Sequence, residues 1–185
     1  FPISPDNDNT RYADLKIEEN LNWLIAVKES HCGGREPKNS IVAIDLGESN
    51  FEKTLISGAD FFSAPVISPD GEKLAWIQWD HPNMPWDSTE LWTANINQDK
   101  ELTNIVKITG NQGESICQPL WSPKNDLYYV SDISGWWNLY QYQNGTHTNL
   151  TPLEGEISQA QWGLGSYYYG FKSENLVIHA INTRG

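Results

Sequence analysis

The pattern of hydrophobic and polar residues is clearest in the stretch APVISPDGEKLAWIQWDHPNMPWDSTELWTANI, where it predicts three short strands. Pro65–Ser68 is extended, and Pro69–Glu72 (PDGE) predicts a tight turn, because proline fixes φ and glycine accepts a positive φ. The second strand, Lys73–Trp79, carries apolar residues on both faces, which indicates a strand covered on both sides. A loop over Asp80–Ser88 leads to a third strand at Glu90–Ile96.

This pattern recurs along the chain. Pro119–Val130 (PLWSPKNDLYYV) repeats Pro65–Trp76 (PVISPDGEKLAW), and the Ser-Pro pair of the turn returns after 54 residues (123 − 69). We expect two weaker copies, at Ala13–Val27 and at Ala160–Phe171. A repeated unit of this length indicates that the fold is built by stacking similar small sheets.

The downstream half of the unit recurs as well. Third strands are expected at Ser40–Leu46, Glu90–Ile96, Asn138–Gln143 and Asn175–Ile181, and fourth strands at Thr54–Gly58, Ile105–Gly110 and Thr148–Pro152. Four short strands in about 45 residues are typical of one β-propeller blade. The sequence therefore predicts an all-β fold, a partial β-propeller of about three to four four-stranded antiparallel blades with WD40-like or TolB-like repeats. A β-sandwich with the same strand spacing is the alternative.

The repeats also divide the chain. We expect residues 1–185 to form a single β-propeller fragment, with blades at approximately 11–58, 59–110 and 111–152 and an incomplete blade at 153–185. Because the chain ends inside a repeat, the expectation is a piece of a longer protein.

Composition narrows the classes of partner. A net charge of −12 argues against nucleic acid, whose phosphates need a basic surface. No apolar run is long enough to cross a bilayer, so no membrane partner is expected. Phe1 opens no signal-peptide pattern, and we expect a cytoplasmic location, with the periplasm as the alternative. Cys32 and Cys117 fall in different units and are expected to be free thiols.

A search for catalytic motifs finds no site in this chain. There is no G-x-S-x-G motif, and the nearest sequence, Gly113–Cys117 (GESIC), lacks the second glycine. The histidines are scattered, and His31 beside Cys32 has too few companions for a metal site. We therefore expect no catalytic, metal-binding or cofactor-binding residues and no cofactor.

Three long connections are the most promising places for binding. In a propeller, the connections Ser30–Asn39, Asp80–Ser88 and Asp132–Trp137 should lie together on one rim, and long loops on a rigid scaffold commonly carry binding sites. The candidate rim or partner-contact residues are His81, Asn83, Met84, Trp86, Glu114, Trp136 and Trp137. The alternative is that the first four belong to a self-packed loop and that the tryptophan pair only packs between blades.

Two segments carry a family resemblance. SPDGEKLAWIQWDHPNMPWDSTELW and ESICQPLWSPKNDLYYVSDISGWWNLY resemble the N-terminal propeller of bacterial serine peptidases of the prolyl oligopeptidase family, in the branch similar to acylaminoacyl peptidases and dipeptidyl peptidases. The Tyr-Ala-Asp sequence at Tyr12–Asp14 also fits, and the resemblance covers about Arg11–Phe171. It implies a following α/β-hydrolase domain with catalytic Ser, Asp and His, to which the propeller admits small peptides. None of those three residues maps onto this chain.

The leading hypothesis is thus a non-catalytic propeller fragment of such a peptidase. It implies as partners the α/β-hydrolase domain of the same parent chain and the peptide substrates of that parent. The alternative is a stand-alone interaction module that binds a protein through its loop rim, and a small metal-binding or glycan-binding propeller is a third. Open blades also predict self-association through the two ends of the fragment, the last blade exposing some of Tyr167, Tyr168, Tyr169 and Val177.

Overall fold

The computed structural model describes residues 3–4, 7–34, 36–47, 51–174 and 176–182, and the regular elements among them are β-strands apart from one short 3₁₀ turn. The first sheet contains β1 (Thr10–Glu18), β2 (Trp23–Ser30), β3 (Lys38–Asp45) and β4 (Glu52–Ser57), with the short 3₁₀ turn η1 (Glu19–Leu21) between β1 and β2. The second contains β5 (Phe61–Ile67), β6 (Lys73–Trp79), β7 (Glu90–Ile96) and β8 (Leu102–Thr109). The third contains β9 (Ile116–Trp121), β10 (Leu127–Ser131), β11 (Asn138–Gln143) and β12 (Thr146–Asn149), and the pair β13 (Tyr169–Ser173) and β14 (Leu176–His179) follows.

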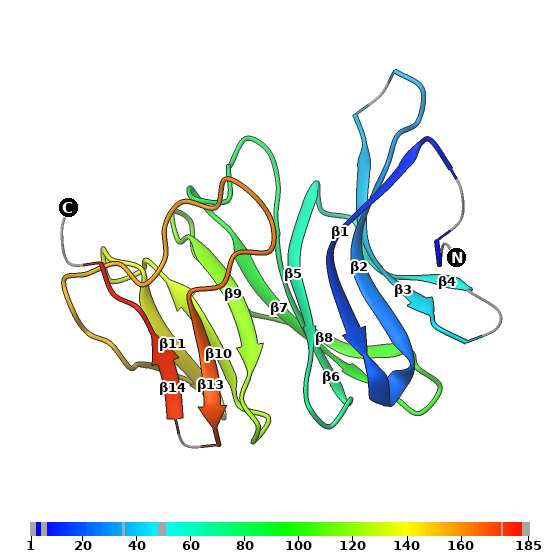
Figure 1. The fold of residues 1–185 in the computed structure, drawn as a ribbon. Coiled ribbons are helices and arrows are strands. Elements are labelled where there is room, and N and C mark those ends of the chain that lie inside the picture. Colours follow the sequence, from blue (N-terminus) through cyan, green and yellow to red (C-terminus); the bar gives the residue numbers. More distant parts are fainter. Residues whose placement is uncertain (1–2, 5–6, 35, 48–50, 175, 183–185) are drawn as a thin grey trace.

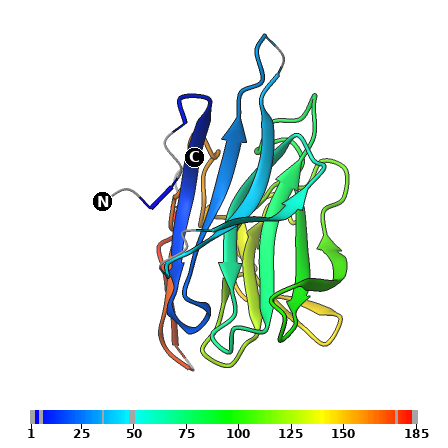
Figure 2. The same ribbon diagram turned by 90° about the vertical axis from the view of Figure 1, so that its right-hand side faces the viewer.

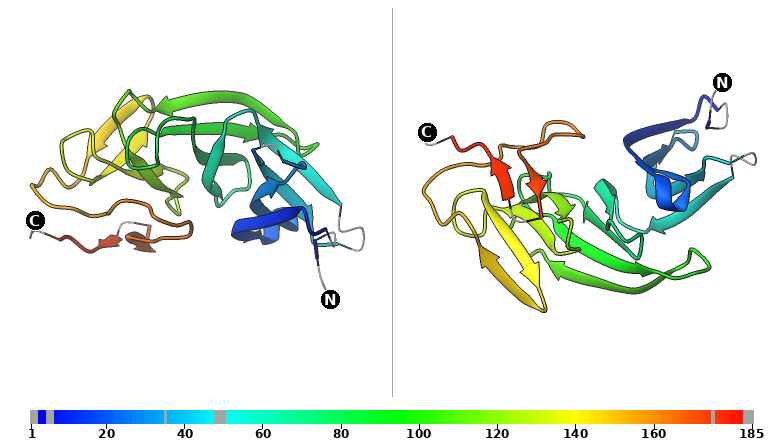
Figure 3. Two further views of the ribbon diagram at one scale, coloured as in Figure 1. Left: turned by 90° about the horizontal axis from the view of Figure 1, so that it is seen from above. Right: turned by 60° about the horizontal axis from the view of Figure 1, so that its bottom comes forward.

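Each of the three four-stranded sheets pairs its strands in chain order, and every pairing is antiparallel. Figure 1 shows the sheets side by side, and the view from above in Figure 3 shows that they follow an arc with β1 near one end and β14 near the other. The first strands β1, β5 and β9 are neighbours in space. This is the arrangement of blades in a β-propeller, which confirms the predicted fold class.

The hydrophobic core lies between sheets rather than within one. A first cluster joins β2 and β3 to β6 and β7, and it includes Trp23, Ile25, Leu74 and Trp76. A second cluster joins the opposite face of β6, at Ala75 and other residues, to β9, β10 and β11, and a third packs β10 and β11 against the β13–β14 pair. The two-sided apolar pattern of β6 thus reflects burial against a neighbour on each face.

The tight turns occupy the opposite rim from the long connections (Figure 2). Ser68 N donates to Lys73 O and Gly71 N donates to Ser68 O, with Gly71 at φ 78°. The repeated turn closes in the same way but is one residue shorter, because Ser122 N donates to Asp126 O and Asn125 N donates to Ser122 O. In both turns the serine hydroxyl also accepts a backbone N–H, from Lys73 at 2.9 Å and from Asp126 at 3.1 Å. The two predicted turns are therefore equivalent, as the repeat indicated.

The fourth unit differs from the prediction. Residues 160–168, expected as a first strand and turn, form no strand, and β13 begins only at Tyr169. Asn182 after β14 hydrogen bonds Glu156 O with its backbone N–H, as Asp132 after β10 hydrogen bonds Ser115 O. The segment Leu176–His179 therefore occupies the place of a second strand, whereas we expected a third strand at Asn175–Ile181, of which residue 175 lies outside the described residues.

The exposed residues at the end of the arc also differ from expectation. Tyr169 is buried and Val177 packs against the third cluster, while Tyr168 is half-buried. Tyr167 is exposed as expected, and the apolar side chains exposed on β14 are instead those of Leu176 and Ile178. Strand alternation explains the difference, because Val177 points to the opposite face from its two neighbours.

Candidate functional site

The candidate site is built on a β-bulge that recurs in the first strand of each complete sheet. The pairing register shifts at the same place in β1, β5 and β9, and the residues at these shifts are Asp14, Ala64 and Gln118. All three have left-handed backbones, with φ of 53°, 49° and 46°. Such bulges bend a strand and redirect its side chains. Proline follows the bulge residue in β5 and β9, where the interrupted ladder tolerates the missing N–H.

Two of the bulge side chains connect neighbouring units. Ala64 N donates to Asp14 Oδ2 at 2.7 Å, which joins β5 to β1. Gln118 accepts from Tyr168 N at 2.5 Å and donates through Nε2 to Tyr169 O at 2.8 Å, which joins β9 to β13. The short side chain of Ala64 lies between those of Asp14 and Gln118 and leaves space at the middle of the first strands β1, β5 and β9.

A pocket of about 330 Å³ occupies this place. Its walls come from five parts of the chain: β1, β5, the end of β6 with the loop that follows it, β9, and residues 161–168. Its lining is largely apolar and includes Val66, Trp79, Met84, Trp86 and Leu120. Asp14 and Lys16 are the charged residues that line it. A volume of this size is near the lower end of small-molecule sites, which measure about 300–1,000 Å³.

Residues 158–168, which we call the strap, close one side of the pocket. The strap lies in the hollow of the arc, where it is drawn in orange (Figure 3). Its Trp162 ring packs on Trp86 with centroids 4.4 Å apart, and Lys16 Nζ lies 4.2 Å from the centroid of the Tyr167 ring. The strap is thus held against the second sheet at one point and against β1 at another.

The structure places the predicted rim residues in three different settings. Met84 and Trp86 line the pocket, as described above. His81 packs edge-on against Phe61, with centroids 4.9 Å apart, and Asn83 lies in the turn whose backbone N–H binds Asp80 O. Trp136 and Trp137 are half-buried, and Trp137 packs against the third cluster. Of the predicted set, only the two residues from the 80–88 loop are brought to the pocket.

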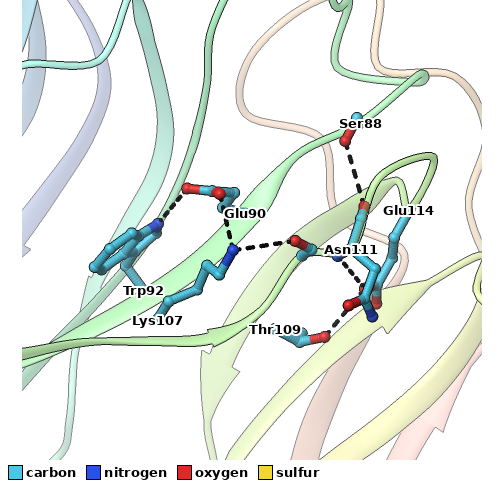
Figure 4. A network of polar contacts seen from close by, with 8 residues as sticks. Ser88, Glu90, Trp92, Lys107, Thr109, Asn111 and Glu114 are labelled. Atoms are coloured by element: carbon cyan, nitrogen blue, oxygen red, sulfur yellow. Dashed lines mark hydrogen bonds and ion pairs between the residues drawn. The ribbon is translucent and has the colours of Figure 1, made fainter.

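Glu114 is buried, although we expected it as a rim contact. Its side chain accepts hydrogen bonds from Thr109 Oγ1, from the Asn111 backbone and side chain, and from Ser131 Oγ. Figure 4 shows the contacts of Glu114 with Thr109 and Asn111, and the bond from Ser131 at the end of β10 links this connection to the third sheet. With 2% of its surface exposed, Glu114 is unavailable to a partner and fixes the joint between the second and third sheets instead.

A surface ion pair lies within the second sheet beside these contacts. Lys107 Nζ lies 3.1 Å from Glu90 Oε1, and Trp92 Nε1 donates to Glu90 Oε2 at 2.8 Å (Figure 4). Ser88 Oγ also donates to Asn111 O, so the end of the 80–88 loop is anchored to the connection beside Glu114. These polar contacts therefore hold in place the loop that forms one wall of the pocket.

Sequence reasoning missed the contribution of β1 and of the strap to the pocket. Asp14 was noticed only as part of a Tyr-Ala-Asp sequence, and Trp162 was assigned to a strand. Nothing in a single sequence indicates that residues about 150 positions apart share a pocket. A Gly-rich stretch around Trp162 (QWGLGS) was the one available signal, since paired glycines favour a loop.

Cys117 lines the pocket but is unsuited to be a nucleophile. Its side chain is buried, and Sγ lies 3.1 Å from Ser158 Oγ. Burial raises the pKa of the Cys117 thiol to about 12, and the bond from Ser158 offsets only part of this effect. Because the thiolate is the reactive form, this thiol stays protonated and inert at neutral pH. Cys117 and the exposed Cys32 are both free, as predicted.

The described part of the chain was also considered as a place for a metal ion or a membrane span, with the following result for each. Within it, no group of three or more His, Cys, Asp or Glu side chains is placed to hold a metal ion. The same residues form no helix with the length and apolar character needed to span a membrane.

Comparison with solved structures defines the class of the protein. The chain superposes on a puromycin hydrolase with a TM-score of 0.90 and 26% identity over 98% of its length, and on a Mycobacterium tuberculosis puromycin-hydrolyzing peptidase with a TM-score of 0.84 and 33% identity over 94%. TolB from Acinetobacter baumannii shares the fold, with a TM-score of 0.58 and 17% identity over 80% of this chain and 35% of its own. The class is therefore a β-propeller of the kind found in peptidases.

The first two structures indicate more narrowly what the chain is similar to. The chain matches the propeller region of serine peptidases of the prolyl oligopeptidase family. It spans about 30% of the puromycin hydrolase chain and 28% of the M. tuberculosis peptidase chain. No family model matches the sequence, and the search of curated proteins gave no match.

Proposed function

We propose that the chain is the non-catalytic propeller of a prolyl oligopeptidase-family serine peptidase. In this proposal it docks against an α/β-hydrolase domain of the same parent chain and gates the access of peptide substrates to it. The observation that carries the proposal is the match of 98% of this chain to only 30% of a puromycin hydrolase. The pocket and strap in the hollow of the arc are where a substrate passing along the inner strands would meet the propeller.

The first test separates the chain from its parent. We expect the 185-residue chain to hydrolyse neither puromycin nor aminoacyl chromogenic amides, and the longer parent to hydrolyse at least one of them. Ser115 provides the control, because its Oγ donates to Pro85 O and its backbone N–H to Asp132 Oδ1, which is a structural arrangement. Turnover by the chain that disappears in Ser115→Ala would contradict the proposal.

A second test concerns docking. The chain and the remainder of the parent would be produced separately, mixed, and analysed by sedimentation velocity. We expect the two parts to form a one-to-one complex. The peptidase activity of this complex should depend on peptide length differently from the activity of the hydrolase part alone. Two parts that stay separate at concentrations of tens of micromolar, roughly the range of weak interfaces, would count against docking.

A stand-alone interaction module is the second candidate function. It is favoured by the apolar side chains exposed on the loop rim, with Met84 50% and Ile133 53% exposed. Isolated exposed residues of this kind are common, so the observation weighs less than the match to the peptidases. A parent reading frame that closes the propeller and then stops, without a hydrolase domain, would favour this candidate.

A further inference from the structure

The hairpin that joins β11 and β12 contains the only Asn-Gly pair of the sequence, Asn144–Gly145. Gln143 pairs with Thr146 across the hairpin, so the turn consists of these two residues alone. Asn144 and Gly145 have left-handed backbones, with φ of 50° and 81°, as a two-residue turn of type I′ requires. Both residues are exposed to solvent.

Neither the side-chain amide of Asn144 nor the backbone nitrogen of Gly145 is held by the protein. Among the residues that the structure describes, none forms a hydrogen bond with either group. The Asp-Gly pair of the first repeated turn is the opposite case. There Gly71 N donates to Ser68 O at 2.8 Å, and the Asp70 carboxylate accepts hydrogen bonds from residues of its own turn. Of the two pairs, only Asn144–Gly145 therefore leaves its side chain and its glycine nitrogen free to react.

The strand that follows the turn also opens easily. β12 has four residues, of which the first three are exposed, and it forms an edge of the third sheet. The fourth strands of the first two sheets, β4 and β8, have six and eight residues. Short exposed segments with few buried contacts open locally at a small cost in free energy. The end of β12 beside the turn can therefore release the backbone of Asn144 while the rest of the sheet stays paired.

We propose that Asn144 is a site of spontaneous deamidation in the folded chain. The Gly145 backbone nitrogen loses its proton and attacks Asn144 Cγ, and glycine has no Cβ to hinder this approach. A bond forms between that nitrogen and Cγ, the bond from Cγ to Nδ2 breaks, and Nδ2 leaves as ammonia. One water then opens the five-membered succinimide at either of its two carbonyl groups. The products are aspartate and isoaspartate, and in isoaspartate the main chain runs through the side-chain carbon.

Both products change the hairpin. Each adds one negative charge at neutral pH, near the Asp126 carboxylate that accepts a hydrogen bond from Gln143 Nε2. Isoaspartate also lengthens the main chain within the turn. A turn of altered length cannot keep Gln143 opposite Thr146, because the turn sets the register of a hairpin. Formation of isoaspartate is therefore expected to loosen β12.

The test follows the folded 185-residue chain during incubation at mildly alkaline pH, where more of the backbone nitrogen is deprotonated. Samples are digested at mildly acidic pH, and fragmentation mass spectrometry locates each lost amide. Isoaspartate is measured by transfer of a labelled methyl group from S-adenosylmethionine with a protein isoaspartyl methyltransferase. We expect ammonia release and methyl labelling to increase together, with both changes located at Asn144.

Two other asparagines of the same chain serve as references. Asn104 is exposed and has the same φ of 50°, but it is followed by Ile105, whose branched side chain shields the backbone nitrogen. Asn39 Nδ2 donates to Asp60 O at 2.7 Å, and the need to break one such bond slows a reaction roughly 10-fold. Asn144 is therefore expected to lose its amide at least roughly 10-fold faster than either reference.

Single substitutions then assign the methyl label. Asn144→Gln is expected to abolish it, because the longer side chain would have to close a six-membered ring. Asn104→Gln replaces an asparagine with the same φ and is the matched control, so it should leave the label unchanged. The comparison of sites within the wild type needs no variant, and it decides the question even if a glutamine strains the hairpin.

The inference is overturned if Asn144→Gln acquires the label as strongly as the wild type, or if Asn104 loses its amide as fast as Asn144. It is also overturned if the folded chain keeps the Asn144 amide while the chain unfolded in urea loses it. None of these results bears on the proposed function, which rests on the match to the peptidases.

Discussion

Gly110 allows the chain leaving β8 to pass close to the start of β7. It has φ of 130°, and a Cβ at this position would lie 2.7 Å from both Glu90 Cα and Thr89 O. Those are backbone contacts that cannot rotate away. Gly110→Ala is therefore expected to lower the free energy of unfolding by at least about 2 kcal/mol, from backbone strain and overlap together.

Urea denaturation measures this effect, with Gly170→Ala as the matched control. Gly170 lies in a strand, has no left-handed backbone, and has open space where its Cβ would stand. We expect the control to change the unfolding free energy by no more than about 0.5 kcal/mol. Equal effects of the two substitutions would show that the backbone around Gly110 relaxes without a loss in the free energy of unfolding.

The two cysteines should differ sharply in reactivity. Cys32 is exposed and Cys117 is buried with a raised pKa, so a thiol reagent at about pH 8 should label one cysteine per folded chain and two after denaturation. Cys32→Ser should abolish labelling of the folded protein. Rapid labelling of that variant would mean that the pocket wall opens readily around Cys117.

Cys117 also makes stability depend on alkaline pH. Its thiol has a pKa raised from 9.0 to about 12 by burial, so above about pH 9 the unfolded chain releases a proton that the folded chain retains. The stabilisation that this thiol contributes is present in full below about pH 9 and is lost as the pH rises toward 12. Urea midpoints at about pH 8 and pH 10.5 should therefore fall more in the wild type than in Cys117→Ala. An equal fall would assign the dependence to other groups, such as the buried Tyr169, whose pKa burial also raises.

At the scale of elements, the repeated turns should respond alike to the same substitution. Ser68 and Ser122 are buried, and each hydroxyl accepts a backbone N–H of its own turn. Ser68→Ala and Ser122→Ala should each destabilise the chain by about 1–3 kcal/mol, because a buried donor loses its acceptor. Ser173→Ala, at an exposed position in β13, should have little effect on the urea midpoint. A large loss in only one turn would show that the two are not equivalent.

The elements could be predicted wherever the repeat is regular. Glu90–Ile96 and Asn138–Gln143 are strands with the predicted bounds, because alternation and spacing support each other there. The fourth unit misled the prediction because Gly163–Gly165 resembles a turn at the repeat position, while the true hairpin begins at Tyr169 and turns after Ser173. The strap is an insertion, and a repeat template has no place for one.

The pocket could be predicted only in part, for a physical reason. Met84 and Trp86 belong to a long loop on a rigid scaffold, and that rule identified them. Asp14, Ala64 and Gln118 reach the pocket through bulges with positive φ at residues other than glycine, which sequence preferences disfavour. Glu114 was misjudged because burial of its carboxylate depends on the joint between two sheets, where it accepts hydrogen bonds from Thr109 Oγ1 and from Ser131 Oγ.

At the scale of the whole molecule, the ends of the arc predict self-association. β14 exposes Leu176 and Ile178, and β1 exposes Leu15 and Ile17, all between 46% and 65% exposed. Strand edges and apolar faces of this kind favour contact with a second chain. Sedimentation equilibrium at micromolar concentrations is expected to show dimers or larger species that grow with concentration.

A charged substitution tests which surface is responsible. Ile178→Lys should shift the equilibrium toward monomer, whereas Thr146→Lys, which adds the same charge to an exposed position of β12, should not. A monomer that melts cooperatively and stays monomeric as its concentration rises would show that these ends need no partner.

The placement of the core between sheets also fixes the order in which the chain can fold during synthesis. Trp23 and Ile25 of β2 are buried against Leu74, Trp76 and Ala94 of the second sheet. This packing cannot form until the ribosome has released β6, so β2 and β3 emerge with this apolar face still uncovered. Each later sheet of the chain emerges beside a sheet that has already been made. A chaperone that binds the nascent chain would therefore find an apolar surface on β2 and β3 until the second sheet follows.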